Sequence, residues 1–89
     1  MMEGNLLHKV QPGYPSAARS ARIQGAVILR AIIGKDGSIT NLHVLRGHPL
    51  LVKSAIDAVS QWRYRPYLLN GQPVEVETFI TVSFKGTRD

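Results

Sequence analysis

The chain of 89 residues contains no cysteine, which excludes disulfide bonds and thiolate metal ligands. It also lacks a long hydrophobic run. Its most apolar stretch, residues 26–33, is interrupted by Arg30 and is far shorter than the roughly 20 residues that cross a bilayer. These 89 residues are therefore expected to include neither a secretory signal nor a transmembrane helix.

Clustered charge is absent as well. The net charge is +5, but lysines and arginines are scattered and form no basic run. The aromatic and arginine cluster at residues 62–67 could stack nucleobases; the alternative places Trp62 in the core and the arginines at a helix end. The second interpretation is favoured, so no nucleic-acid partner is predicted. With 44% apolar residues, the composition indicates one small globular domain.

No pattern typical of catalysis or metal binding is present. Glu75 and Glu77 fall on one strand face and resemble a carboxylate pair, but a solvated face that discourages aggregation is the stronger interpretation. The three histidines, His8, His43 and His48, lack the i, i+4 spacing of a helical metal site. The chain is predicted not to be an enzyme, and neither cofactor nor metal is expected.

The longest regular pattern is the stretch from residue 73 to 85. Apolar residues alternate with polar ones, which indicates a strand buried on one face. The inward set is Val74, Val76, Ile80, Val82 and Phe84. Thr78 and Phe79 break the alternation. A long strand near a chain end is expected at a sheet edge, where its unpaired backbone groups can bind another chain.

Two further strands are predicted. Residues 26–33 are apolar on both faces, which is typical of a central strand. The Gly-Lys-Asp-Gly sequence at 34–37 then predicts a hairpin turn, with a returning strand at residues 38–46. In that strand the apolar parity slips between Ile39 and Leu42, which predicts a β-bulge.

Two helices are predicted, one short and one longer. Residues 16–22 are rich in alanine; Pro15 suits the first helical position, and Gly25 is expected to stop the helix. Residues 50–62 repeat apolar side chains at helical spacing. The apolar stripe is expected to consist of Leu51, Ala55, Val59 and Trp62.

The segment after the second helix is predicted to be irregular. Arg63 and Arg65 are placed at the C-terminal end of the helix, where positive charge meets the negative end of its dipole. Pro66 is expected to terminate the helix. Residues 67–72 are predicted to form a loop that turns at Asn70 and Gly71.

Together these elements predict an α+β fold. Two helices cover one face of a three-stranded antiparallel sheet, in two layers. Numbered along the chain, the strands take the order second, first, third (2-1-3). Residues 1–10 are expected to be a flexible lead-in or an expression remnant, residues 11–86 the folded domain, and residues 87–89 a tail.

Three stretches in this order resemble one known family. The first is Gln-Pro-Gly-Tyr-Pro at 11–15, leading to Arg-Ile-Gln-Gly at 22–25. The others are Asp-Gly-Ser-Ile at 36–39 and Trp-Arg-Tyr-Arg-Pro at 62–66, before the closing strand. The chain resembles the C-terminal domains of the TonB family, periplasmic energy transducers of Gram-negative bacteria, over about residues 11–86. The resemblance implies the same two-layer α+β fold.

The resemblance also implies a function. In the family an inner-membrane helix and a proline-rich linker precede this domain, and an inner-membrane proton-driven motor complex acts through them. The domain lies in the periplasm and binds the TonB-box peptide of an outer-membrane transporter, so that siderophores, vitamins or other nutrients enter. The implied protein is anchored in the inner membrane and uses no cofactor. The resemblance does not indicate which transporter or nutrient is involved.

The family's pattern further implies the binding residues. The strand that pairs with the peptide corresponds to Ile80, Thr81, Val82, Ser83, Phe84 and Lys85. Gln11, Tyr14 and Pro15 match a segment that lies near the bound peptide. For Tyr14 and Pro15 the alternative is a structural role, packing the lead-in and starting the helix. Some members carry a basic residue two places after this proline, whereas this chain has Ala17, so no charge contact is implied there.

Two alternatives remain open from the sequence. The domain could link envelope layers as a TonB-like or TolA-like structural module without binding a transporter. An open strand edge could also pair two copies of the chain, either edge to edge or by strand exchange.

Overall fold

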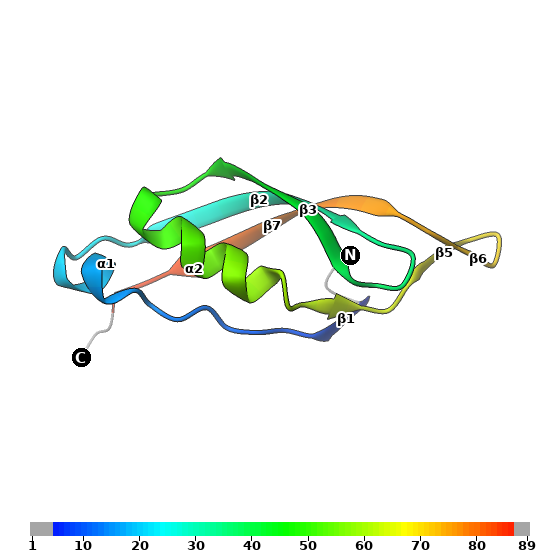
Figure 1. The fold of residues 1–89 in the computed structure, drawn as a ribbon, viewed down its shortest axis with the longest axis horizontal. Helices are drawn as coiled ribbons and strands as arrows, with labels where there is room; N and C mark the ends of the chain where they lie inside the picture. Colours follow the sequence, from blue (N-terminus) through cyan, green and yellow to red (C-terminus); the bar gives the residue numbers. More distant parts are fainter. Residues whose placement is uncertain (1–4, 87–89) are drawn as a thin grey trace.

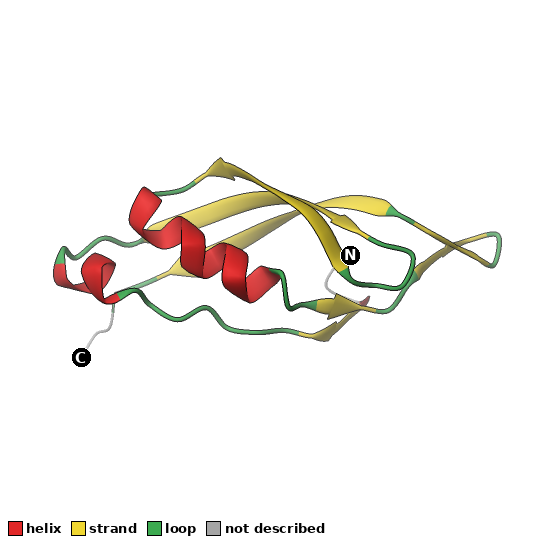
Figure 2. Ribbon diagram, in the orientation of Figure 1, coloured by secondary structure: helices red, strands yellow, loops and turns green. Residues whose placement is uncertain are grey.

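A three-stranded antiparallel sheet forms one layer of the computed structural model, which describes residues 5–86 (Figure 1). Its order is β3 (Ile39–Arg46), β2 (Gly25–Ile33) and β7 (Val76–Phe84), so the first long strand is central. Helix α2 (Pro49–Val59) lies in front of this sheet in Figure 2, and the short helix α1 (Ser16–Ser20) lies at the end of the sheet where β2 begins and β7 ends. The predicted α+β class and the predicted 2-1-3 order are confirmed.

The core lies between α2 and the inner face of the sheet. On β2 the inward side chains are completely buried, and they are Val27, Leu29, Ala31 and Ile33. The stripe predicted on the second helix is also buried, namely Leu51, Ala55, Val59 and Trp62. Each large aliphatic side chain buried in this way contributes roughly 1.5–3 kcal/mol. The sheet and helix are therefore held together mainly by apolar burial.

The β-bulge predicted in the second strand is confirmed. The pairing of β2 with β3 shifts register between the Arg30–His43 pair and the Ile32–Thr40 pair. Asn41, inside this interval, has a positive φ of 48°, which asparagine tolerates better than most residues. A second register shift occurs farther toward the C-terminal end of β3.

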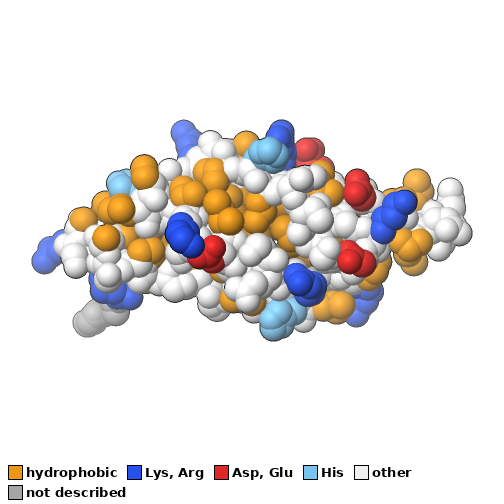
Figure 3. Space-filling view, viewed as in Figure 1, with side chains coloured by type: hydrophobic (Ala, Val, Ile, Leu, Met, Phe, Trp, Pro, Cys, Tyr) orange, Lys and Arg blue, Asp and Glu red, His pale blue; other side chains and the backbone are white. Residues whose placement is uncertain are grey.

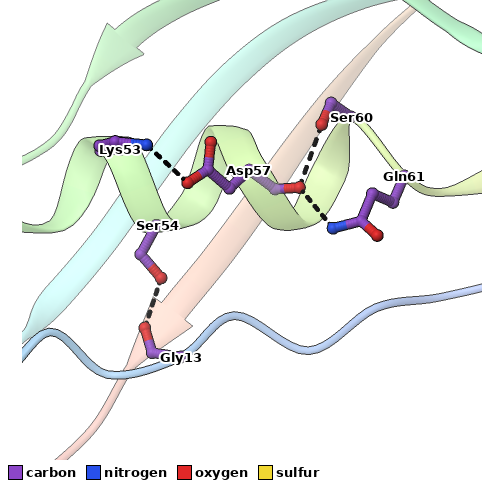
Figure 4. A network of polar contacts seen from close by, with 6 residues as sticks. All are labelled: Gly13, Lys53, Ser54, Asp57, Ser60 and Gln61. Carbon is purple, nitrogen blue, oxygen red and sulfur yellow. Dashed lines mark hydrogen bonds and ion pairs between the residues drawn. The ribbon is translucent and has the colours of Figure 1, made fainter.

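Helix α2 ends three residues earlier than its apolar period predicted. Its last residue is Val59. The side chains of Ser60 and Gln61 both donate to the carbonyl oxygen of Asp57, each at 3.0 Å, as Figure 4 shows. These side chains satisfy a carbonyl that has lost its helical partner and so favour termination here.

The segment after α2 is a strand and not a helix end. Arg63 and Tyr64 form β4 (Arg63–Tyr64), which pairs antiparallel with β1 (Leu6–His8). The predicted placement of Arg63 and Arg65 at the helix C-terminus was therefore wrong, and Pro66 does not end the helix. The sequence gives no signal for β1, because three residues are too few to show a period.

The predicted loop at residues 67–72 is a β-hairpin. Strands β5 (Tyr67–Leu69) and β6 (Gln72–Val74) pair antiparallel, and they project at one end of the molecule in Figure 1. Asn70 and Gly71 have φ values of 53° and 79°, as a type I′ hairpin turn requires. This hairpin divides the predicted long strand at Glu75 into β6 and β7.

The first helix also begins and ends differently from the prediction. Pro15 has extended backbone angles, φ −60° and ψ 138°, and precedes the helix as its N-cap residue. The helix is over by Ser20, and Arg22 takes a left-handed φ of 58°. Gly25 is the first residue of β2 and does not stop the helix.

Within the described residues, neither helix has the length and hydropathy needed to cross a bilayer.

Candidate functional site

The outer edge of β7 is the most regular unpaired strand edge of the three-stranded sheet. On its inner side β7 pairs with β2 along its whole length, from the Gly25–Phe84 pair to the Ile33–Val76 pair, without a register shift. Among residues 5–86 no strand pairs with its other side. The outer edge therefore offers backbone N–H and C=O groups to an added strand.

The side chains of β7 fix this edge on one face and leave the other face exposed, where Phe79 is the large apolar residue, 60% exposed. Ile80, Val82 and Phe84 are at most 6% exposed and pack in the core cluster. The intervening Thr81 and Ser83 are exposed, as is Lys85 after the strand. The buried set holds the strand in place, so an incoming chain meets an edge that is already ordered.

The other outer edge of the sheet, on β3, is less suitable for pairing. Within the described residues β3 pairs only with β2, but that ladder shifts register at two places. Bulges bend a strand and increase its twist, which discourages edge-to-edge pairing. The two open edges are therefore not equivalent, and β7 is the better template.

Tyr14 joins the N-terminal lead-in to the end of this edge. Its ring meets the ring of Phe84 edge-on, with centroids 5.7 Å apart and an interplanar angle of 82°. Its hydroxyl donates to the carbonyl oxygen of Ile23 at 2.5 Å. The guanidinium of Arg19 lies 4.8 Å from the ring centroid. The structure thus brings two of the predicted site segments together, at the C-terminal end of β7.

Gln11 lies along a groove that Tyr14 and Pro15 also line. It is exposed and lines an open groove of about 610 Å³ between the lead-in and α2. Figure 4 shows the two contacts that build this groove: the Ser54 hydroxyl donates to the Gly13 carbonyl, and Lys53 pairs with Asp57 at 2.9 Å. Gln11 therefore lies beside α2, and Tyr14 lines the same groove while its ring also contacts Phe84 of β7.

Among residues 5–86, Asp36, Glu75 and Glu77 lie away from the C-terminal end of β7. Glu75 is exposed, and Glu77 forms a 3.7 Å ion pair with Arg30 across the solvated face of the sheet. Asp36 lies in the turn between β2 and β3. Hydrogen bonds from the Ser38 hydroxyl and then from its backbone N–H lower the pKa of the Asp36 carboxyl. Asp36 therefore stabilises a turn.

Sequence reasoning missed two small cavities at the C-terminal end of β7. One, of about 340 Å³, lies over the strand ends and is lined by residues 24–26 and 83–85. The other, also about 340 Å³, is lined by Tyr14, Arg19, Arg22, Gln24 and Gly86. Gln24 connects the two, because its Oε1 accepts a 2.6 Å hydrogen bond from the Gly86 N–H. No local pattern could reveal them, since their walls are far apart in the sequence.

Comparison with known proteins identifies relatives of this chain over most of its length. Residues 10–85 match the family described as Gram-negative bacterial TonB protein C-terminal. Protein TonB of Vibrio cholerae is 34% identical over 79 residues, covering 86% of this chain and 32% of the relative. Protein TonB of Escherichia coli is 32% identical over 62 residues, covering 67% and 26%. The chain thus spans about a third or less of these relatives' length.

A solved structure shows the same fold. The solution NMR structure of the Pseudomonas aeruginosa TonB C-terminal domain superimposes with a TM-score of 0.79 at 27% identity, covering 94% of this chain and 87% of that one. The family match and the solved structure each cover most of this chain. The chain therefore belongs to the family of Gram-negative bacterial TonB C-terminal domains.

Proposed function

We propose that this chain is the periplasmic domain of a TonB-type energy transducer. It binds the TonB-box peptide of outer-membrane transporters by β-strand addition, and it passes on energy derived from the proton-motive force for nutrient uptake. The observation that carries the proposal is the open, uninterrupted edge of β7. An extended peptide gains main-chain hydrogen bonds on such an edge.

The expected affinity is moderate. Backbone groups of every second residue point outward, so four or five of the nine residues of β7 can pair with a peptide. Each hydrogen bond contributes about 1 kcal/mol net, and ordering the flexible peptide opposes this gain. Binding is therefore reversible, as a cyclic transducer needs. Backbone pairing also tolerates varied peptide sequences, so one domain can serve several transporters.

The lead-in is attached to the core of the domain at two points. The indole Nε1 of Trp62 donates to the Val10 carbonyl at 3.0 Å, and Tyr14 packs against Phe84 at the end of β7. In the proposed function an inner-membrane anchor and its proton-driven motor complex act on the segment before the lead-in. These contacts support the transfer of that force to the strand that holds the peptide.

A titration of the isotope-labelled domain with a TonB-box peptide tests the proposal. NMR shifts should concentrate in residues 80–85 and around residues 11–15, while β3 serves as the internal control and stays unchanged. Peptides methylated at single backbone nitrogens should then lose affinity at every second position, since only alternate N–H groups face β7.

Two results would contradict strand addition on β7. One is a flat titration at millimolar peptide, which would favour the envelope-linking role instead. The other is binding that tolerates methylation at every position. The mass of the free domain should be measured over a wide concentration range alongside, because a second copy of the chain would compete for the same edge.

A further inference from the structure

We propose that Phe79 is a specificity-determining residue of the β7 edge, and that it selects peptides with a β-branched or aromatic side chain directly across the edge from it. The inference rests on the proposed function, because the selected side chain belongs to the strand that pairs with β7. Phe79 breaks the polar alternation of the exposed face of this strand and is 60% exposed.

The backbone of β7 fixes the face on which Phe79 lies. Its neighbours Thr78 and Ile80 are only 5% and 6% exposed, and successive side chains of a strand point to opposite faces. Phe79 therefore lies on the outer face of the sheet, away from the core under α2. Its partner on β2 is Arg30, in a ladder that has no register shift, so this placement follows from the regular pairing of the whole strand.

Strand β2 covers only one flank of the Phe79 side chain. Ile28 and Ile32 lie diagonally across the ladder from Phe79 and are half-buried, and such diagonal neighbours are within reach of an aromatic ring. Arg30, directly opposite, forms an ion pair with Glu77 in which Nε and Oε2 are 3.7 Å apart. Among residues 5–86 no strand pairs with the other side of β7, so the second flank of Phe79 is open.

Exposure alone does not distinguish Phe79, since single apolar side chains are common on protein surfaces. Figure 3 shows several of them on the face that α2 covers and at the β5–β6 end. The position of Phe79 on an unpaired strand edge is what distinguishes it, because such edges usually carry residues that discourage pairing. Glu77, Thr81 and Ser83 follow that rule at the other outward positions of β7. Phe79 instead favours pairing at one position.

An added strand would bring one of its own side chains against this open flank. Paired strands lie about 4.7–4.9 Å apart, and residues directly across from each other point to the same face. The peptide residue across from Phe79 would therefore pack beside the ring, and both side chains would lose contact with water. Aromatic and β-branched side chains form favourable cross-strand pairs with an aromatic residue, whereas serine has little apolar surface to bury.

Pairing has to extend only slightly to reach this residue. Phe79 immediately precedes residues 80–85, and the regular edge of β7 continues to Val76. One side-chain contact at this end would add selectivity to an edge that otherwise binds backbone groups. Peptides that pair equally well through their backbones would then be ranked by the single residue across from Phe79.

The test moves one apolar residue along a host peptide. Each position of a TonB-box peptide in turn carries valine or serine, and the dissociation constants are measured by NMR titration. Nuclear Overhauser effects between the valine methyl groups and the Phe79 ring protons identify the position that lies across from Phe79. At that position the valine peptide should bind more tightly than the serine peptide.

Variants of the domain separate the contact from the strand propensity of valine. The valine-to-serine affinity ratio in the parent chain is divided by the same ratio in Phe79→Thr, so that effects of the peptide alone cancel. The quotient should be about 2 to 5, as cross-strand pair energies imply. Threonine suits an exposed strand position, so the variant should fold, and Phe79→Leu should retain part of the preference.

The matched control is Leu45→Thr. Leu45 is 51% exposed on β3, the strand at the opposite edge of the sheet. This substitution removes an apolar side chain of similar exposure without changing β7. The same quotient should therefore be close to one.

Three outcomes overturn the inference. A quotient of one for Phe79→Thr would show that the ring does not select a side chain. An equal quotient for Leu45→Thr would show a general response to lost apolar surface. A lower mass of the free Phe79→Thr domain at high concentration, measured by sedimentation, would assign the ring to contact between two copies of the chain.

These outcomes are distinct from failure of the proposed function. In all three, the serine peptides still perturb residues 80–85, so strand addition itself stands. If no peptide of the series perturbs these residues, the proposed function is refuted, and the role of Phe79 is refuted with it.

Discussion

Replacing Gly37 by alanine should lower the free energy of unfolding by about 3–6 kcal/mol, through three separable effects. Gly37 has a φ of 87°, and a side chain in the left-handed region costs roughly 1–2 kcal/mol. An added Cβ would lie only 1.8 Å from the carbonyl oxygen of Tyr64. Relieving that clash requires the turn and β4 to separate, with an overpacking cost of about 1–3 kcal/mol.

The separation also breaks a hydrogen bond. The Tyr64 N–H donates to the Gly37 carbonyl at 2.8 Å, and a bond of this kind contributes about 1 kcal/mol. Gly71→Ala is the matched control. Gly71 has a similar φ of 79°, but nothing lies within 4 Å of an added Cβ. That variant should lose only the conformational cost, about 1–2 kcal/mol.

Urea denaturation followed by the fluorescence of Trp62, the chain's single tryptophan, measures both variants against the parent chain. The difference between the two losses reports the contact with Tyr64 alone. If Gly37→Ala and Gly71→Ala lower the free energy of unfolding by the same amount within error, the close approach of the turn to β4 does not constrain residue 37. That result would refute the reasoning.

Two further predictions concern single hydrogen bonds. Tyr14→Phe removes the hydroxyl that donates to Ile23 and should lower the free energy of unfolding by about 0.5–1.5 kcal/mol; an unchanged denaturation midpoint would contradict it. The pKa of Asp36, followed by NMR, should lie below the usual value of an aspartate and rise in Ser38→Ala. Because folding lowers this pKa, the ionised carboxylate stabilises the fold at pH values above the pKa of the unfolded state. This contribution is lost as the pH falls through the lowered pKa of the folded state. A pKa insensitive to Ser38→Ala would contradict the assignment.

The strand that carries the candidate site could be predicted from its own residues. Alternation from Val76 to Phe84 places four apolar side chains inward, and burial of every second residue is a local property of an extended chain. The bulge near Asn41 was likewise visible as a parity slip. The β5–β6 hairpin was available in principle, because Asn70-Gly71 is a strong type I′ signal. It was missed because the strands around it are only three residues long.

The end of α2 shows where a periodic pattern misleads. Trp62 continues the apolar spacing of the helix, yet the chain has already left the helix when it reaches this residue. Trp62 is buried because its indole meets the lead-in at Val10, which is a contact between residues 52 positions apart. A buried side chain at helical spacing does not require helical backbone, and only the tertiary partner distinguishes the two cases.

By itself the sequence determined the class of fold, the central strand, the closing strand and the family, because side-chain periodicity and turn residues act over a few neighbouring positions. Only the tertiary structure decided which sheet edge is regular enough to pair. It also placed Tyr14 against Phe84, and gathered Arg19 and Arg22 beside the end of β7. These features depend on contacts between segments that are distant along the chain. Packing of the whole core brings those segments together.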